Sequence, residues 1–365
     1  MTTPLLHLVA AARPNLPKLG VLWAALAARP GLCEARLVHT GQHYDTAMFH
    51  AHLADLGLPA PHHALAVAGG SHAALTGRTM LACEALWLRE RPALVVVVGD
   101  VDGTLAAALA ARKLGIAVVH LEAGLRCADR DMAEEINRRA VDAIADLLWP
   151  PSHGAAATLL REGHAPARVV AVGNTMAASL LQHLPRALAT PLPAGLAPRG
   201  YGVLTLHRAE NVDAPARLEA WLAAVARAAA LLPLAWPCHP RTAKRMAEFG
   251  LAPPPGVLVL PPLGYLAFLG LLARARLVAS DSGGIQEEAT VLDLPCLTLR
   301  DSTERPETLG SSRLVQPAEL PAAVAEVLAG GWPRAVRPAL WDAEVGARMV
   351  ASLAAFLPRL ADEFG

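Results

Sequence analysis

Short hydrophobic runs alternate with longer Ala- and Leu-rich stretches along the whole chain. In runs such as PALVVVVGD, at residues 92–100, apolar residues occupy consecutive positions, which is typical of strands buried on both faces. The predicted strands lie in LLHLVAA, EARLVHT, PALVVVVGD, IAVVHLEAG, ARVVAVGN, GVLTLHR, LAWPCHP, GVLVLPPL, ARLVASDSGG and LPCLTLRDS. Because helical stretches separate them, the pattern predicts a doubly wound α/β architecture that occurs twice.

The chain has 365 residues, which suits two domains better than one core. We expect one domain over residues 1–172 and a second over residues 173–347, facing each other across a cleft. The last helical stretch, from about residue 348 to residue 365, is expected to pack back on the first domain. A Pro-, Ala- and Gly-rich segment at residues 184–200 is predicted to form a linker-like loop.

Composition narrows the class of protein. With 54% hydrophobic residues, 18% charged residues and a formal net charge of zero, the chain is predicted to be globular and not to bind nucleic acid. No Lys or Arg precedes the first apolar run, and we expect no membrane insertion and a cytoplasmic location. Five scattered cysteines without a C-x-x-C pair predict neither disulfides nor a zinc site.

Charged residues follow the predicted strands of the first domain. Asp100 comes directly after PALVVVV, Glu122 follows IAVVHL, and Arg13 and Lys18 follow the first strand. Parallel strands meet ligands at their carboxyl ends, so we expect these side chains to lie at one sheet edge. For any one of them, a helix N-cap or a loop charge is the alternative.

The segment DMAEEINRR, residues 131–139, resembles the start of a helix. Glu134 and Arg138 are four residues apart and are predicted to share one face of that helix. They are candidates for the same site. The alternative is an exposed ion pair with no function.

The second domain has polar strand ends of its own. His207 follows GVLTL, His239 follows LAWPC, and Arg305 lies in the charge-dense loop RDSTERPETLG at residues 300–310. A single histidine is more often structural than catalytic, but His207 is followed directly by Arg208.

The stretch SDSGGIQEEATVL, residues 280–292, joins a predicted strand to a predicted helix. Ser282, Gly283 and Gly284 would leave backbone N–H groups and the positive end of the helix dipole free to bind a diphosphate. Glu288, one turn later, could accept hydrogen bonds from the two hydroxyls of a ribose. The stretch therefore predicts a nucleoside diphosphate site.

Other cofactor patterns are missing from the sequence. No G-x-G-x-x-G follows a predicted strand, there is no P-loop, and no H-x-x-x-H lies beside a carboxylate. His62 and His63 are predicted to lie in a Pro-rich loop. We therefore expect no NAD and no metal.

Ten motifs in order give the chain a family resemblance. They are ARPNLPK, TGQHYD, GDVDGTLAAALAA, HLEAGLR, EEINR, GNTM, LTLHRAENV, CHPRT, SDSGGIQEEA and RDSTERPE. Together they resemble the non-hydrolysing UDP-N-acetylglucosamine 2-epimerases, which have a two-domain fold of the glycosyltransferase-B type. The resemblance departs at Ala133, Ala178 and Asp293, where many relatives have Pro, Asp and Gly.

The resemblance implies roles by position. Residues that match the binding site for the UDP-sugar are Arg13, Lys18, Ser282, Gly283, Gly284, Glu288 and Arg305. Residues that match the catalytic set are Asp100, Glu122, Glu134, Arg138 and His207. Gln42, His43 and His239 match positions that, in some bacterial members, contact a second UDP-GlcNAc as an activator. A homodimer is expected by the same analogy.

The implied reaction interconverts UDP-GlcNAc and UDP-ManNAc at C2. It eliminates UDP to give 2-acetamidoglucal and adds UDP back with the proton on the other face, without a nicotinamide or a metal. The substrate could instead be a modified UDP-sugar of the 2,3-diacetamido uronic acid type. Rival functions are a glycosyltransferase of the same fold, a hydrolysing epimerase that releases ManNAc, and a non-catalytic sensor of UDP-sugars.

Overall fold

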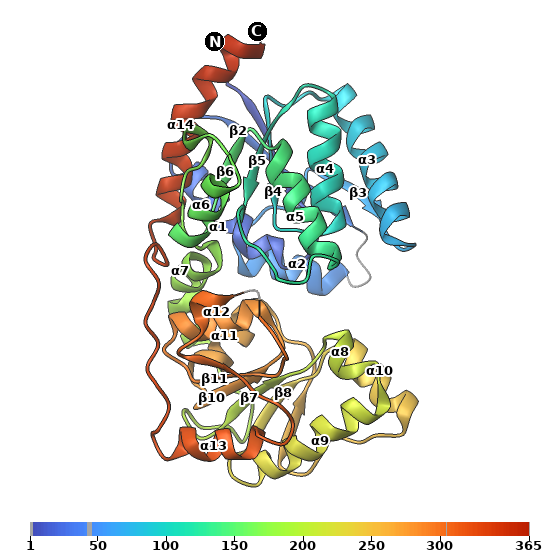
Figure 1. The fold of residues 1–365 in the computed structure, drawn as a ribbon, viewed down its shortest axis with the longest axis vertical. Coiled ribbons are helices and arrows are strands. Elements are labelled where there is room, and N and C mark those ends of the chain that lie inside the picture. Colours follow the sequence, from blue (N-terminus) through green and yellow to red (C-terminus); the bar gives the residue numbers. More distant parts are fainter. Residues whose placement is uncertain (1–2, 42–45, 304, 365) are drawn as a thin grey trace. The chain divides into compact units, whose positions relative to one another are not determined.

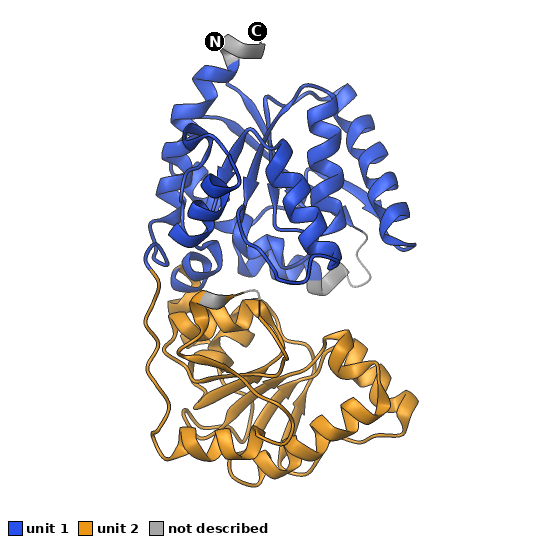
Figure 2. Cartoon of the chain, viewed as in Figure 1, with its two compact units in different colours: residues 1–181, 339–365 blue, residues 182–338 orange. Residues whose placement is uncertain are grey.

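The computed structural model describes residues 3–41, 46–303 and 305–364. The chain forms two compact units (Figure 2). Unit 1 comprises residues 1–181 and 339–365, and unit 2 comprises residues 182–338. The boundary falls inside one continuous helix, α7 (Thr175–Ala189), so no change in composition marks it.

Unit 1 contains a parallel six-stranded sheet with the order β3-β2-β1-β4-β5-β6 (Figure 1). Its strands are β1 (Leu5–Ala10), β2 (Glu34–Gly41), β3 (His63–Val67), β4 (Leu94–Val98), β5 (Ala117–Leu121) and β6 (Leu147–Trp149). Every residue of β4 and β5 is buried, as the apolar runs predict for central strands covered on both faces.

The helices of unit 1 cover both faces of this sheet. They are α1 (Asn15–Ala27), α2 (Thr46–Asp55), α3 (His72–Arg89), α4 (Asp102–Lys113), α5 (Ala133–Ile144), α6 (His153–Arg161), the short 3₁₀ helix η1 (Pro166–Arg168), the first part of α7, and α14 (Val345–Phe364). The last helix, α14, packs against α1, where a Cβ on Gly346 would lie 3.0 Å from the Cβ of Ala25.

Unit 2 contains a second parallel six-stranded sheet, with the order β12-β11-β10-β7-β8-β9. Its strands are β7 (Gly202–Thr205), β8 (Leu234–Pro237), β9 (Val257–Leu260), β10 (Leu277–Ser280), β11 (Cys296–Thr298) and β12 (Ser312–Leu314). Its helices are α8 (Ala209–Val212), α9 (Pro215–Ala229), α10 (Pro240–Phe249), α11 (Tyr265–Ala273), α12 (Gly283–Val291), η2 (Pro306–Thr308) and α13 (Leu320–Leu328).

Both sheets have the same doubly wound topology, which confirms the predicted α/β class. In each sheet the first strand in the chain lies beside the fourth, β1 beside β4 and β7 beside β10, and the chain order reverses at that pair. Such a pair is a topological switch point, where the loops after the two strands diverge and leave room for a ligand.

Some sequence expectations about individual elements were wrong. Residues 167–174 were expected to form a strand, but only one isolated bridge forms there, between Leu148 and Val169. His63 lies in β3 rather than in a loop, and residues 184–189 belong to α7 rather than to a linker. Strands β6 and β12 have three residues each and were missed, because such short runs carry no clear period.

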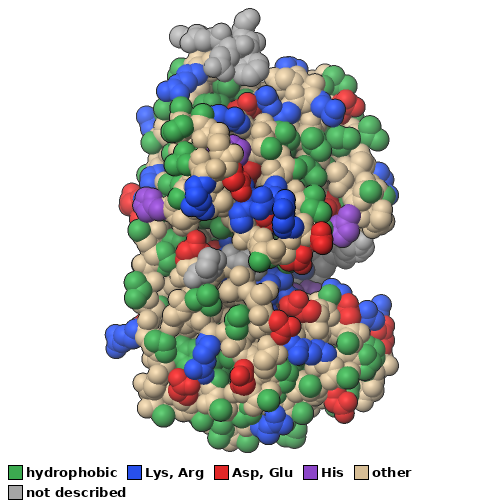
Figure 3. Space-filling model, in the orientation of Figure 1, with side chains coloured by type: hydrophobic (Ala, Val, Ile, Leu, Met, Phe, Trp, Pro, Cys, Tyr) green, Lys and Arg blue, Asp and Glu red, His purple; other side chains and the backbone are tan. Residues whose placement is uncertain are grey.

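No helix in the described ranges is long and apolar enough to cross a membrane. On the face shown in Figure 3, acidic and basic side chains both occur and lie close to one another. This mixed surface agrees with the formal net charge of zero and gives no support to a binding surface for a nucleic-acid backbone.

Candidate active site

The turn after β4 holds Asp100 in a fixed position. Gly99 adopts a left-handed conformation, with a φ of 68°, that reverses the chain at the end of the strand. The Asp100 carboxylate accepts a hydrogen bond of 2.5 Å from the guanidinium of Arg138 in α5. Its carbonyl accepts another, of 2.9 Å, from the Asn137 side chain. The Arg138 side chain is 3% exposed and that of Asp100 is 29% exposed, so the carboxylate is the accessible partner.

Glu122, at the end of β5, has a strained backbone. Its φ of 73° is rare for a residue with a side chain and costs on the order of 1 kcal/mol or more. The Glu122 carboxylate is ion-paired with the ammonium group of Lys18, in the first turns of α1. A Cβ on Gly99 would lie 3.5 Å from a Glu122 carboxylate oxygen, so the turns after β4 and β5 converge.

Glu134 and Arg138 both lie in α5, but the alternative of an ion pair between them does not hold. The Glu134 side chain is exposed at the start of the helix and makes no hydrogen bond or ion pair within the part of the chain that the structure describes. The ion pairs are made by its neighbour Glu135, which is fully buried between Arg138 and Arg139. Arg138 lies on the buried face of α5, and Glu135, three residues before it, shares that face.

A buried network connects the turns after β4 and β5. His120 donates from Nε2 to the carbonyl of Gly99 at 2.9 Å, and its Nδ1 lies 2.6 Å from Asp142 of α5. Asp142 also accepts hydrogen bonds from the N–H of Gly124 at 3.1 Å and from Arg126 at 2.7 Å. Burial opposes ionisation of Asp142, but the charges and hydrogen bonds of His120 and Arg126 lower its pKa below the ordinary value.

The turn after β1 is closed by Asn15, a residue that sequence reasoning had not assigned. Its side-chain oxygen accepts hydrogen bonds from the N–H groups of Ala11 and Ala12, at 3.0 and 2.9 Å. The start of α4 approaches this turn so closely that a Cβ on Gly103 would lie 2.7 Å from the Cβ of Ala11. Arg13, in the same turn, is exposed.

In unit 2, Asp281 organises the switch point between β7 and β10. One of its carboxylate oxygens accepts hydrogen bonds of 2.9 Å from the N–H groups of His207 and Arg208, and the other lies 2.8 Å from His207 Nδ1. Burial tends to raise the pKa of Asp281, but these partners hold it below the ordinary value. Because Nδ1 is paired with the carboxylate, the Nε2 atom of His207 is left as the group that can meet a ligand.

The predicted anion turn has the expected geometry. Helix α12 begins at Gly283, with Ser282 as its N-cap residue and no side chain capping its first turn. The N–H groups of Gly283 and Gly284 donate no hydrogen bond to any described residue. Donors of this kind, together with the helix dipole, can bind a phosphate group.

Glu288 lies in the second turn of α12 and is 4% exposed. Burial, with a contribution from the neighbouring charge of Glu287, raises the pKa of Glu288 to about 8. A buried carboxyl group with no salt-bridge partner among the described residues is costly unless a ligand uses it. Its position one turn after the phosphate site fits the predicted contact with a ribose.

Arg305 forms an ion pair with Glu287, at 3.4 Å, and its side chain is 13% exposed. The same loop is tied to α12 by Gln286, whose side-chain oxygen accepts hydrogen bonds from Thr303 at 2.8 Å and Thr308 at 3.3 Å. Arg305 therefore contributes to holding its loop against α12.

Of the three residues matched to an activator site, Gln42 and His43 lie outside the described residues. His239 is the N-cap of α10, where its Nδ1 accepts a hydrogen bond of 3.2 Å from the N–H of Arg241. Its ring centroid lies 5.5 Å from that of His207. His207 and His239 are therefore neighbours.

One cluster has the composition of a metal site, namely His7, His63 and Glu90. His7 Nδ1 accepts a hydrogen bond of 2.9 Å from Trp87, so its Nε2 carries the proton and donates to Glu90 at 2.8 Å. Arg36 binds the other oxygen of Glu90 at 2.5 Å. A protonated Nε2 and an adjacent guanidinium do not fit a cation, and burial lowers the pKa of His7 to about 4.

Sequence reasoning missed three positioning residues, His120, Asp142 and Asp281. Each left a weak signal, because a polar residue stands inside or directly after an otherwise apolar run, as in IAVVHL. A buried polar residue must find partners. The sequence alone does not say that those partners are the backbone groups of the neighbouring turns.

Comparison with known proteins agrees with this geometry. The sequence model described as UDP-N-acetylglucosamine 2-epimerase matches residues 24–354. The chain is 40% identical over 315 residues to the UDP-N-acetylglucosamine 2-epimerase of Methanocaldococcus jannaschii, covering 83% of this chain and 86% of that protein. It is 41% identical over 310 residues to the UDP-2,3-diacetamido-2,3-dideoxy-D-glucuronate 2-epimerase of Pseudomonas aeruginosa, with the same coverage of each chain.

The fold gives the same result. The crystal structure of the M. jannaschii UDP-GlcNAc 2-epimerase in complex with UDP-GlcNAc and UDP superposes with a TM-score of 0.86 at 36% identity. The superposed residues cover 96% of this chain and 99% of the M. jannaschii chain. The chain therefore belongs to the UDP-N-acetylglucosamine 2-epimerase family.

Proposed function

We propose that the chain interconverts UDP-GlcNAc and UDP-ManNAc by inverting C2 of the sugar. The observation that carries the proposal is the pair of carboxylates, Asp100 and Glu122, that end adjacent strands and are each held by a buried cation. A protein that only bound UDP-sugars would have no need for them.

In this proposal unit 2 holds the nucleotide. The free N–H groups at the start of α12 bind the diphosphate, and Glu288 accepts hydrogen bonds from the ribose hydroxyls. When the C1–O bond breaks, its electron pair leaves with the diphosphate, and the helix dipole stabilises the added negative charge. His207 Nδ1 is paired with Asp281, so Nε2 is the ring nitrogen assigned to contact the departing group.

The proposal assigns proton transfer to unit 1. A carboxylate removes the C2 proton as UDP leaves, giving 2-acetamidoglucal, and UDP then adds back as a proton is delivered to the opposite face. Asp100 and Glu122 are the groups assigned to this work, with Lys18 and Arg138 fixing their orientation. Glu134, which the resemblance also implicates, is exposed on α5 and contributes only if substrate reaches it. No nicotinamide or metal takes part.

A modified substrate is the second candidate, because the P. aeruginosa relative that acts on a diacetamido uronate is as similar to this chain as the M. jannaschii enzyme. Incubating the purified protein with each UDP-sugar separately and following C2 epimers by NMR tests both candidates. We expect UDP-GlcNAc to be converted at the higher kcat/KM. Conversion of neither sugar would overturn the proposed function.

Regulation by substrate is a further part of the proposal. The M. jannaschii relative was crystallised with both UDP-GlcNAc and UDP, and His239 lies beside His207 in this chain. We therefore expect epimerisation of pure UDP-ManNAc to start slowly and to accelerate when a trace of UDP-GlcNAc is added. An immediate full rate with UDP-ManNAc alone would show that no activator is needed.

We also propose that the chain forms a homodimer. Leu81 and Leu88 lie seven residues apart on α3 and are 62% and 70% exposed, which places two large apolar side chains on one outer face of that helix. Light scattering should give twice the mass of 38.2 kDa. Leu88→Glu should shift the protein toward the monomer, and a monomeric wild type would contradict the proposal.

A further inference from the structure

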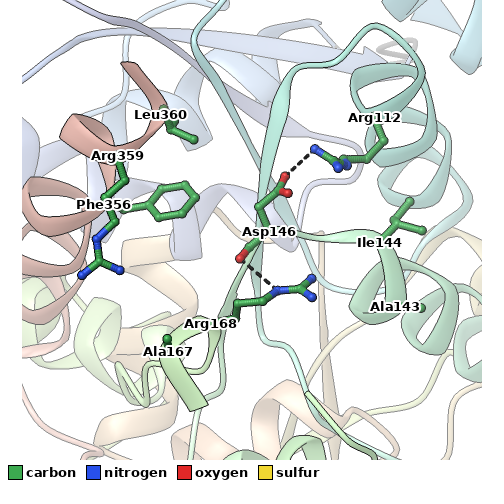
Figure 4. A pocket seen from close by; sticks show the side chains of 9 residues that line it. All are labelled: Arg112, Ala143, Ile144, Asp146, Ala167, Arg168, Phe356, Arg359 and Leu360. Carbon is green, nitrogen blue, oxygen red and sulfur yellow. Dashed lines mark hydrogen bonds and ion pairs between the residues drawn. The ribbon is translucent and has the colours of Figure 1, made fainter. Parts of the chain in front are cut away.

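Unit 1 contains a cavity of about 610 Å³ that plays no part in the proposed reaction (Figure 4). This volume is in the range of binding sites for small molecules, roughly 300 to 1,000 Å³. Its lining combines three guanidiniums, one carboxylate and five apolar side chains. The lining residues are Arg112, Ala143, Ile144, Asp146, Ala167, Arg168, Phe356, Arg359 and Leu360.

The cavity lies at the amino-terminal ends of β5 and β6, whereas Asp100 and Glu122 lie at the carboxyl ends of β4 and β5. Asp146 directly precedes β6 and accepts a hydrogen bond from the N–H of Val118, near the start of β5. In contrast, Asp100 and Glu122 follow the carboxyl ends of their strands. A ligand in this cavity would therefore be separated from those carboxylates by the length of β5.

One side of the cavity is held rigidly by polar contacts. Arg112, at the end of α4, donates to Asp146 at 2.8 Å, so the carboxylate is already neutralised (Figure 4). Arg168 donates from Nε to the carbonyl of Asp146 at 3.2 Å and from a terminal nitrogen to the carbonyl of Ala145, at the end of α5. Both guanidiniums keep further N–H groups without a partner among the described residues.

The other side comes from α14 and is apolar apart from one cation. Figure 4 shows Phe356 and Leu360 on one side of the cavity and Arg112 and Ile144 on the other. Arg359, from the same helix, is exposed and makes no hydrogen bond or ion pair with the described residues. A neutralised carboxylate beside unsatisfied guanidiniums leaves a positive site against an aromatic wall.

We propose that this cavity binds a small organic anion whose phosphate or carboxylate meets Arg359 and whose flat apolar part packs on Phe356. Guanidinium groups bind such anions through paired, charge-assisted hydrogen bonds. An aromatic ring of the ligand would stack on Phe356 or meet its edge. The inference is independent of the proposed reaction, because it uses no residue assigned to it.

The test uses 1-naphthyl phosphate, which carries both parts of the proposed ligand, on the full chain saturated with UDP. Calorimetry should show one binding event per chain, with a dissociation constant in the millimolar range or below. Inorganic phosphate and 1-naphthol, each with one part only, should bind at least tenfold more weakly. Loss of the binding event when UDP is added would place the probe at the nucleotide site and overturn the inference.

Variants locate the event. Arg359→Ala should weaken 1-naphthyl phosphate about tenfold or more, since a hydrogen bond to a charged group is lost, and Phe356→Leu should weaken it without changing the binding of phosphate. Arg29→Ala removes an exposed arginine of the same unit that has no partner among the described residues, and is the matched control. Equal loss in Arg29→Ala and Arg359→Ala, or no loss in either, would overturn the inference.

Discussion

The switch points of the two units share one topology but present opposite chemistry. In unit 1 the buried partners are cations, with Lys18 and Arg138 at 9% and 3% exposure, and they hold the carboxylates of Glu122 and Asp100. In unit 2 the buried partner is a carboxylate, Asp281, at 0% exposure, and it holds His207 and backbone N–H groups.

This difference shows how the same topological switch point can hold side chains of opposite charge. A buried charge is stable only when it is paired, so the sign of the buried residue decides the sign of the group that it holds in place. In the proposed function, the buried cations of unit 1 orient the carboxylates that move the proton, and the buried anion of unit 2 fixes the turn that carries His207.

The largest effect, a loss of kcat, is expected from substitution of the two carboxylates of unit 1. Asp100→Asn and Glu122→Gln should each lower kcat by roughly 100-fold or more, because a positioned acid or base contributes on that scale. The affinity for UDP, measured by calorimetry, should stay nearly unchanged. The matched control is Glu84→Gln, an exposed position on α3. A loss of UDP affinity that parallels the loss of kcat would contradict the division between the units.

Substitution of Glu288 in unit 2 should have a smaller effect, and it should change UDP binding rather than kcat. Glu288→Ala removes the proposed ribose contact and should weaken UDP binding by about 2 kcal/mol, roughly 30-fold. The KM for the UDP-sugar should rise, whereas kcat, the rate at saturating substrate, should change much less. Glu219→Ala, at an exposed position of α9, serves as the control. Unchanged UDP affinity in Glu288→Ala would remove Glu288 from the nucleotide site.

The buried network of His120 and Asp142 tests the role of positioning in unit 1. It contacts the backbone of the turns that carry Asp100 and Glu122, and not their carboxylates. Asp142→Ala leaves His120 and the N–H of Gly124 without their partner and should lower kcat about tenfold while UDP affinity is retained. Asp142→Asn, which can still bond both groups, should recover most of that loss. If Asp142→Asn and Asp142→Ala lose kcat equally, the hydrogen bonds to these turns do not position Asp100 and Glu122.

The last effect is on folding rather than on catalysis, and it is a pH dependence of stability. The pKa of Glu288 is about 8 in the folded chain and near 4.5 when unfolded, so between these values the folded state binds the extra proton. Raising the pH through this window therefore lowers the free energy of unfolding, by at most about 1.4 kcal/mol per pH unit. Glu288→Gln stays neutral and should lose less stability. Parallel denaturation profiles of the two proteins from pH 5 to pH 8 would contradict the raised pKa.

The sequence predicts features that depend on a local pattern better than contacts between residues far apart in the chain. The doubly wound class and the α12 turn could be predicted, because consecutive apolar residues and the Ser-Gly-Gly junction are local signals. The pairing of Lys18 with Glu122 spans 104 positions, and no local pattern encodes it. Glu135 was passed over for Glu134 because both are spaced to meet Arg138, at i, i+3 and i, i+4, and spacing alone does not say which of the two is buried.

The central claim is that unit 1 moves the C2 proton while unit 2 holds UDP. Turnover of UDP-GlcNAc in D2O, followed by NMR, measures this most directly. The account predicts deuterium at C2 of both epimers, little incorporation with Asp100→Asn or Glu122→Gln, and incorporation by Glu288→Ala that recovers when the substrate concentration is raised. Epimerised product that carries no deuterium at C2 would contradict the claim.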